Sequence, residues 1–147
     1  MLDLEHFIPY RLSVLSNRIS RAIAAGYRER FGLSVTEWRV MAVLGRDAGL
    51  SASEVAQRTA MDKVAVSRAV ATLLERSLLE RRIADDDRRR SVLGLSSQGR
   101  SVYGEVAPMA LAFEARLLDG VSQTERDALF ALLDRLDALP LEAASGG

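Results

Sequence analysis

Apolar residues recur along the chain at the spacing of amphipathic helices. The first such stripe has intervals of four, three, four and four residues, with arginines between its members: Ile8, Leu12, Leu15, Ile19 and Ile23. These intervals place the side chains on one face of a helix. The pattern predicts a long helix over Phe7 to Arg30, and Gly32 suits the cap that ends it.

Capping signals divide the next part of the chain into shorter helices. The serine–glutamate pairs Ser34/Glu37 and Ser51/Glu54 have the spacing of a capping box, in which each side chain bonds the other residue's backbone N–H. The first pair predicts a helix that ends near the glycines at 45 and 49, and the second predicts a short helix to about residue 58. Asp62 can cap a third helix, which runs to about residue 77.

The remaining pattern predicts two short strands and two further helices. The strands are Leu79 to Ile83 and Ser91 to Leu95, joined by a charged stretch. One helix runs from Ser96 toward Leu118, with a kink or fraying expected at Pro108. The other runs from Ser122, and Pro140 ends it. Its leucine stripe is Leu129, Leu132, Leu133, Leu136 and Leu139. The fold class is therefore mainly α with a small β-hairpin, and its order is that of a winged helix-turn-helix.

The third short helix carries an unusual outer face. Its apolar side is Val66, Ala69, Val70 and Leu73. Its opposite side is Val64, Ser67, Arg68 and Ala71. A surface helix normally carries charged residues there, whereas a helix in the major groove of DNA needs a slim face with hydroxyl and guanidinium donors. The alternative is a core helix packed on both sides, which Ser67 and Arg68 disfavour because both are costly to bury.

The stretch between the strands reads ADDDRRR, from Ala84 to Arg90. On a wing tip beside DNA, arginines suit a narrow minor groove, where the phosphate potential is most negative. The three aspartates would then hold arginine side chains extended through charge-assisted hydrogen bonds. The alternative is a charged turn that is simply solvated.

The charge balance supports one positive surface on an acidic body. The formal net charge of the chain is zero, but residues 58–90 hold nine basic and six acidic residues, and residues 104–147 hold three basic and eight acidic. The absence of cysteine excludes disulfides and thiol chemistry, and the single histidine disfavours a zinc site. We therefore expect no metal, no cofactor and no enzymatic activity. No apolar run approaches a membrane span of about 18 residues, so a cytoplasmic protein without a membrane partner is expected.

The middle of the chain resembles the DNA-binding core of the MarR (multiple antibiotic resistance regulator) family of bacterial transcription factors. The matching pieces are SRAVATLLERSLLERR, for the recognition helix and first wing strand, and DRRRSVLGLSSQG, for the wing and the start of the next helix. The order of the surrounding helices also fits, so the resemblance extends from Leu4 to Leu139. Two departures are Ser77, where the family usually has glycine, and the absence of its usual wing proline.

The resemblance implies an N-terminal dimerisation helix (1–33), a winged helix-turn-helix (34–98) and C-terminal dimerisation helices (99–139). From its composition after the helix-ending proline, the segment 140–147 is expected to be a flexible tail. The resemblance also places Arg68 at the DNA and makes Asp87 and Arg89 a wing-tip pair in which the aspartate orients a minor-groove arginine. The expected DNA-binding residues are Ser51, Ser53, Asp62, Lys63, Val64, Ser67, Arg68, Asp87, Arg88, Arg89 and Arg90.

Both ends of the chain carry more apolar surface than a lone winged domain could bury. We expect them to form a twofold homodimer, as the resemblance also implies, and the expected interface residues are Leu4, Phe7, Ile8, Leu129, Leu132, Leu133 and Leu136. Two recognition helices would then bind a palindromic double-stranded operator with half-sites about 10 base pairs apart. The alternative is that these leucines close a monomeric bundle.

The resemblance further implies release from DNA by a small aromatic or phenolic acid, or its conjugate, and action as a repressor. Candidate effector-binding residues are His6, Tyr10, Arg11, Arg18, Trp38 and Arg39. An arginine near aromatic side chains suits an aromatic carboxylate. Against this, Trp38 on an amphipathic helix is typical of a core residue. The alternative function is a winged-helix dimer that binds another protein and senses no ligand.

Overall fold

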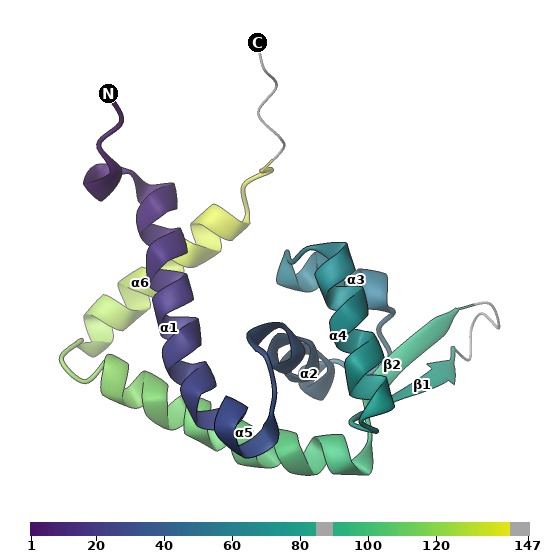
Figure 1. The fold of residues 1–147 in the computed structure, drawn as a ribbon. Coiled ribbons are helices and arrows are strands. Elements are labelled where there is room, and N and C mark those ends of the chain that lie inside the picture. The colour runs from purple at the N-terminus through teal and green to yellow at the C-terminus, as the bar shows by residue number, and fades with distance from the viewer. Residues whose placement is uncertain (85–89, 142–147) are drawn as a thin grey trace. The chain divides into compact units, whose positions relative to one another are not determined.

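The computed structural model describes residues 1–84 and 90–141. Figure 1 shows a mainly helical chain with one two-stranded hairpin, which confirms the predicted fold class. The elements in chain order are the 3-10 helix η1 (Leu4–His6), α1 (Ile8–Phe31), α2 (Val35–Arg46), α3 (Ala52–Thr59), α4 (Lys63–Glu75), β1 (Leu79–Ile83), β2 (Ser91–Leu95), α5 (Ser97–Leu117) and α6 (Gln123–Asp137). Met1–Phe113 form one compact unit and Glu114–Gly147 a second, and α5 continues from the first into the second.

The predicted capping residues begin the short helices. Ser34 accepts a hydrogen bond from the Glu37 N–H at 3.1 Å, and the Glu37 carboxylate accepts one from the Ser34 N–H at 3.0 Å. Ser51 and Glu54 repeat this reciprocal arrangement at the start of α3. Each box satisfies two N–H groups that a helix would otherwise leave unpaired. Gly32 ends α1 in the left-handed conformation, with a φ of 65°.

The core of the first unit lies between α1, α2, α3, α4, β1, β2 and the first half of α5. Its members are apolar side chains with almost no exposed surface, among them Tyr27, Leu33, Val40, Met41, Leu44, Val55, Val66 and Leu73. The turn between α3 and α4 is short because Ala60 takes a left-handed φ of 51° and Asp62 caps α4 two residues later. The helix-turn-helix is therefore fixed by burial on one side and by capping at its turn.

The end of α4 is closed by a Schellman motif built on Ser77. Its φ is 60°, and its N–H donates to the carbonyl of Leu74 at 3.0 Å. The N–H of Leu78 donates to the carbonyl of Leu73 at 2.9 Å, and both leucines of this second pair are buried. These are the two bonds of the motif, which normally has glycine in the left-handed position. Serine adopts that conformation here, so replacing the expected glycine changes the residue but not the cap.

Ser96 joins the end of α4 to the start of α5. Its hydroxyl donates to the Ser77 carbonyl at 2.6 Å and accepts the Gly99 N–H at 2.9 Å. A Cβ on Gly99 would collide with the carbonyl oxygen of Leu78. The start of α5 therefore approaches the backbone that follows α4 so closely that only glycine fits at position 99.

The wing is an antiparallel pair in which Leu79 lies opposite Leu95 and Ile83 lies opposite Ser91. The two strands have the bounds that the sequence predicts. A third segment, which the sequence pattern did not indicate, adds to the outer edge of β2 through an isolated bridge between Leu50 and Leu93. The Leu93 N–H donates to the Leu50 carbonyl at 2.7 Å, so the chain just before α3 is fastened to the wing.

Two expectations concern the C-terminal helices. Pro108 lies inside α5, which continues on both sides of it, so the helix does not end there. In the second unit, α6 begins with a capping box of Ser122 and Glu125, and Arg126 donates to the Leu118 carbonyl at 2.9 Å. None of the helices in the described part of the chain is long and apolar enough to cross a membrane.

We predict that Ser77→Gly stabilises the protein. A left-handed residue with a Cβ costs about 1–2 kcal/mol, and glycine removes this strain at an entropic cost of about 0.5–1 kcal/mol. The free energy of unfolding should rise by roughly 0.5–1 kcal/mol, measured by urea denaturation at constant protein concentration. The matched control is Ser101→Gly within α5, where glycine should destabilise the helix. Destabilisation by both substitutions would contradict the argument.

Candidate nucleic-acid interface

The two sides of α4 differ sharply in exposure. The apolar side, Val66, Ala69, Val70 and Leu73, is at most 5% exposed. The opposite side is exposed and consists of Lys63, Val64, Ser67, Arg68 and Ala71. The helix packs on α2, α3 and β1 through its buried side alone. The first unit therefore does not cover the outer face, and this excludes the alternative in which α4 is packed on both sides within that unit.

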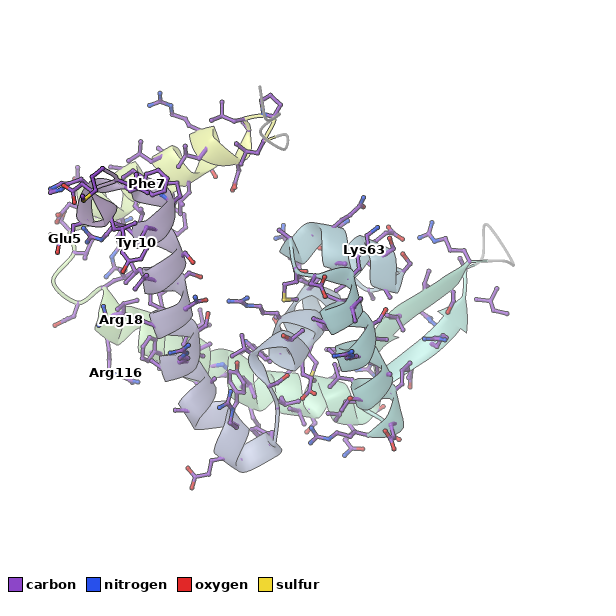
Figure 2. All side chains as sticks on the ribbon, turned by 45° about the horizontal axis from the view of Figure 1, so that its top comes forward. Glu5, Phe7, Tyr10, Arg18, Lys63 and Arg116 are labelled. Carbon is purple, nitrogen blue, oxygen red and sulfur yellow. The ribbon has the colours of Figure 1, made fainter. Side chains whose placement is uncertain are left out.

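Arg68 borders a shallow hollow of about 240 Å³ between α4 and the start of α2. Its other lining side chains are small or polar: Ser34, Thr36, Glu37, Ala65, Ala69 and Thr72. Lys63 stands at the N-terminal end of α4, as Figure 2 shows. The exposed side of the helix therefore combines a cation at its first residue, a guanidinium one turn later and slim side chains between them.

Several predicted DNA-binding residues form internal hydrogen bonds. The Asp62 carboxylate accepts the Ala65 N–H at 3.0 Å as the cap of α4. Ser51 is half-buried, and its hydroxyl accepts the Glu54 N–H at 3.1 Å. Ser53, in the first turn of α3, is exposed. Asp62 and Ser51 therefore position the two helices of the motif, whatever further contacts they make.

Arg76 fastens the C-terminal end of α4 to α1. Its guanidinium donates to the carbonyls of Phe31 and Gly32, the latter at 3.2 Å, at the end of α1. Carbonyls at a helix C-terminus carry partial negative charge, which favours a cation there. No local sequence pattern indicates this contact, because 44 residues separate Arg76 from Gly32.

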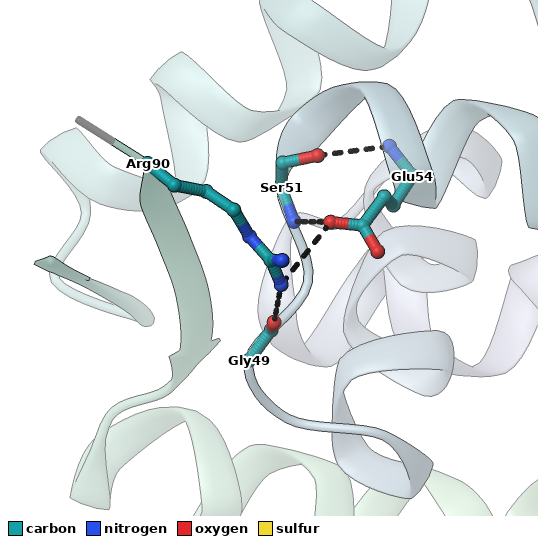
Figure 3. Close-up of polar contacts among 4 residues, drawn as sticks. All are labelled: Gly49, Ser51, Glu54 and Arg90. Carbon is teal, nitrogen blue, oxygen red and sulfur yellow. Dashed lines mark hydrogen bonds and ion pairs between the residues drawn. The ribbon is translucent and has the colours of Figure 1, made fainter. Parts of the chain in front are cut away.

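The wing predictions fall partly outside the described residues: Asp87, Arg88 and Arg89 belong to the stretch 85–89. Arg90 is described, and its Nη2 donates to the Gly49 carbonyl at 3.3 Å and lies 3.5 Å from Oε1 of Glu54 (Figure 3). Hydrogen bonds from Ser51 are the main cause that lowers the pKa of the Glu54 carboxyl below its usual value, and the charges of Arg90 and Arg58 lower it further. The carboxylate is therefore ionised at neutral pH.

The predicted effector residues lie in three places. Tyr10, Arg11 and Arg18 line a hollow of about 360 Å³ along α1, where Figure 2 labels Tyr10 and Arg18. His6 lies outside this lining, and its Nδ1 is 2.7 Å from Oδ2 of Asp3 in an exposed pair. Arg39, on α2, donates to the Ser20 hydroxyl at 2.7 Å.

Trp38 belongs to an aromatic cluster at the edge of the core. Its ring centroid lies 5.7 Å from those of Tyr27 and Tyr103. Tyr27 is 1% exposed, and this burial raises the pKa of its hydroxyl against the opposing charges of Arg39 and Arg28. A Cβ on Gly45 would meet the Tyr103 ring at 2.7 Å, so glycine makes room for the stack. Trp38 therefore packs on the core, and its ring is only partly accessible.

All the predicted interface residues are exposed in the single chain. Their exposed fractions range from 38% for Leu133 to 62% for Ile8. The N-terminal group comes from η1 and α1, and the C-terminal group from α6. Exposed large apolar side chains gathered on one segment, as in each of these two groups, are typical of an interaction site. Among residues 1–84 and 90–141, no group of three or more His, Asp or Glu side chains could hold a metal ion.

Comparisons with known proteins agree on one family. The sequence model of the MarR family matches residues 31–90. The HTH-type transcriptional regulator BilQ of Clostridium symbiosum is 25% identical over 108 residues, which cover 74% of this chain and 75% of BilQ. A crystal structure of a MarR/EmrR family transcriptional regulator from Acinetobacter sp. ADP1 is similar with a TM-score of 0.85 and 28% identity, over 92% of this chain and 96% of that one. CouR from Rhodococcus jostii RHA1, solved with p-coumaroyl-CoA bound, shares the fold with a TM-score of 0.81 and 22% identity, over 97% of this chain and 99% of that one.

Proposed function

Because the chain belongs to the MarR family of transcriptional regulators, we propose that it binds a palindromic DNA operator as a homodimer and that a small aromatic ligand releases it. The observation that carries the proposal is the exposed face of α4. It is slim, it holds no acidic side chain between Lys63 and Ala71, and it presents Ser67 and Arg68 outward. A hydroxyl and a guanidinium are donors that base edges in the major groove accept.

The wing supplies the second contact. In this proposal Asp87 orients Arg89 into the adjacent minor groove, with Arg88 alongside. A narrow minor groove attracts arginine because the phosphates on both sides strengthen its negative potential. The exposed Lys63 would contact a phosphate, which strengthens binding without reading sequence. Protein docking through the same face is disfavoured, because hot spots are enriched in large aromatic anchors and Ser67 and Ala71 are small.

We predict that Arg68→Ala weakens binding to the operator by about 1–3 kcal/mol and that the loss depends on sequence at particular bases. The operator can be sought in the protein's own upstream DNA, with affinity measured by fluorescence anisotropy at several salt concentrations. Parent binding should fall steeply with salt, because phosphate contacts release counterions. Arg28→Ala, an exposed arginine of α1, is the control and should bind like the parent. Equal binding by Arg68→Ala and the parent would remove Arg68 from the interface.

Dimerisation places two recognition helices on one particle. A single module holds few base pairs, so two modules gain affinity through effective concentration. The exposed leucines of α6 and the apolar residues of η1 and α1 give this dimer its apolar surface. Because a twofold axis relates the two recognition helices, the operator should contain two symmetric half-sites about 10 base pairs apart.

We predict that the parent sediments with about twice the 16.1 kDa chain mass at micromolar concentration. Leu133→Glu should shift it toward the monomer, since an unpaired carboxylate is costly to bury in an interface. Ile83→Glu places the same charge on an exposed apolar residue of β1 and should leave the dimer intact. A parent that sediments as a single chain would rule out the dimer.

The effector is proposed to be an aromatic carboxylic acid or its coenzyme A conjugate. Support comes from the chemistry of the α1 hollow, where the rim of Tyr10, Arg11 and Arg18 offers a ring and two guanidinium groups. The fold neighbour CouR was solved with p-coumaroyl-CoA bound. A ligand that binds more tightly to a dimer whose two recognition helices are spaced differently shifts the population toward that form, which does not fit the operator.

We predict that at least one aromatic acid or acyl-CoA conjugate raises the midpoint of thermal unfolding. A ligand bound to the folded state alone stabilises it by about 2.7 kcal/mol at one hundred times its Kd. The same compound should release the operator and raise expression of a repressed reporter. Arg18→Ala should lose the thermal response, whereas Arg28→Ala should keep it. A compound that stabilises the protein without affecting DNA binding would contradict the regulatory role.

A further inference from the structure

Arg90 reaches from the start of β2 to the segment that precedes α3. Its guanidinium donates to the Gly49 carbonyl at 3.3 Å, and the same Nη2 lies 3.5 Å from the Glu54 carboxylate (Figure 3). These partners lie 41 and 36 residues earlier in the chain, on the other side of the recognition helix in sequence. The contact therefore joins the wing to the helix-turn-helix.

The carboxylate that receives Arg90 is already held in place. Oε1 of Glu54 accepts the Ser51 N–H at 3.2 Å, and the Glu54 N–H donates to the Ser51 hydroxyl at 3.1 Å. An isolated ion pair at this exposure, 41% for Arg90 and 38% for Glu54, contributes little because water screens it. Here the acid is ordered by its capping box before the arginine binds, so less side-chain freedom is lost on forming the contact.

The contact adds to a short pairing at the edge of the wing. The Gly49 N–H donates to the Leu93 carbonyl at 2.9 Å, and the Leu93 N–H donates to the Leu50 carbonyl at 2.7 Å. Arg90 lies three residues further toward the tip of the hairpin. A hairpin of two strands is only marginally stable by itself, so an additional attachment near the tip limits how far the strands can swing.

We propose that Arg90 is a positioning residue that clamps the wing to the first turn of α3, and that it does not contact DNA. The clamp consists of Arg90, Gly49, Ser51 and Glu54. This takes Arg90 out of the expected DNA-binding set, and the proposal rests on the proposed DNA-binding function. By holding the wing at a fixed distance from α4, the clamp lowers the ordering cost when both elements dock together.

The direction in which Glu54→Gln changes the affinity for DNA separates this proposal from simple electrostatics. Glu54→Gln keeps the capping box, since glutamine serves at that position, but removes the negative charge that receives Arg90. If charge near DNA were all that mattered, losing an acid would tighten binding. If the clamp positions the wing, the same substitution weakens binding.

The test compares the parent with Arg90→Gln, Glu54→Gln and the double variant, by anisotropy on the operator at several salt concentrations. We expect each single substitution to weaken operator binding about two- to fivefold. The double variant should bind at least as tightly as the single variant with the lower affinity, because both substitutions break the same contact. The dependence of log K on log salt should match the parent for Arg90→Gln, and Arg90→Lys should recover part of the loss. The control is Glu80→Gln, an exposed acid of β1 outside the clamp, which should bind equally or more tightly.

Two outcomes would overturn the proposal. One is a slope of log K against log salt that is shallower by about one in Arg90→Gln than in the parent, which signals a lost phosphate contact; the other is tighter DNA binding by Glu54→Gln. Amide hydrogen exchange in the free protein gives a readout that needs no DNA. Exchange at Gly49 and Leu93 should be several-fold faster in both single variants, with the amide of Val70 in α4 unchanged. If the parent binds no DNA, the proposed function fails, and unchanged exchange at Gly49 and Leu93 would then refute the clamp itself.

Discussion

The burial of one side of α4 is the constraint on which the rest of the structure depends. Full burial of a valine or leucine side chain contributes roughly 1.5–3 kcal/mol, and α4 buries Val66, Val70 and Leu73 against its neighbours. Because α2, α3 and β1 all pack on this side, the rotation of α4 about its axis is fixed. A slip by one residue would turn the helix by about 100° and bring Arg68 toward the core, where an unpaired guanidinium is costly. The exposed face is therefore as strictly determined as the buried one.

Polar contacts at the two ends of α4 complete this placement. Asp62 caps the first turn, while Arg76 binds the last carbonyls of α1 and the Ser77 carbonyl accepts the hydroxyl of Ser96. The C-terminal end of α4 is thus bonded to α1 and to the start of α5. A displacement of either helix must move α4 or break these bonds. α4 is consequently coupled to α1 and α5 by these hydrogen bonds, in addition to apolar packing.

The sequence predicts the features that depend on residues close together in the chain. Both predicted capping boxes, the Gly32 cap and the two strands follow from short patterns, and all are present. What it could not predict depends on contacts between distant segments. The bridge of Leu50 to Leu93 and the contact of Arg90 with Gly49 each span about forty residues and have no local signature. The effector candidates illustrate the same limit, because helical periodicity cannot say which faces of separate helices meet.

Internal contacts also change the meaning of the charge balance. Among the nine basic residues between positions 58 and 90, Arg58 lies 2.7 Å from the Asp47 carboxylate, Arg76 binds carbonyls and Arg90 contacts Glu54. These arginines are not equivalent to freely solvated cations, so counting them overstates the charge available to phosphates. Arg58 and Arg90 also offset the negative charge of two carboxylates, at the end of α2 and at the start of α3. A chain with no net charge can therefore distribute its charge unevenly. Part of its arginine offsets neighbouring acids, while Lys63 and Arg68 lie exposed on one side of α4.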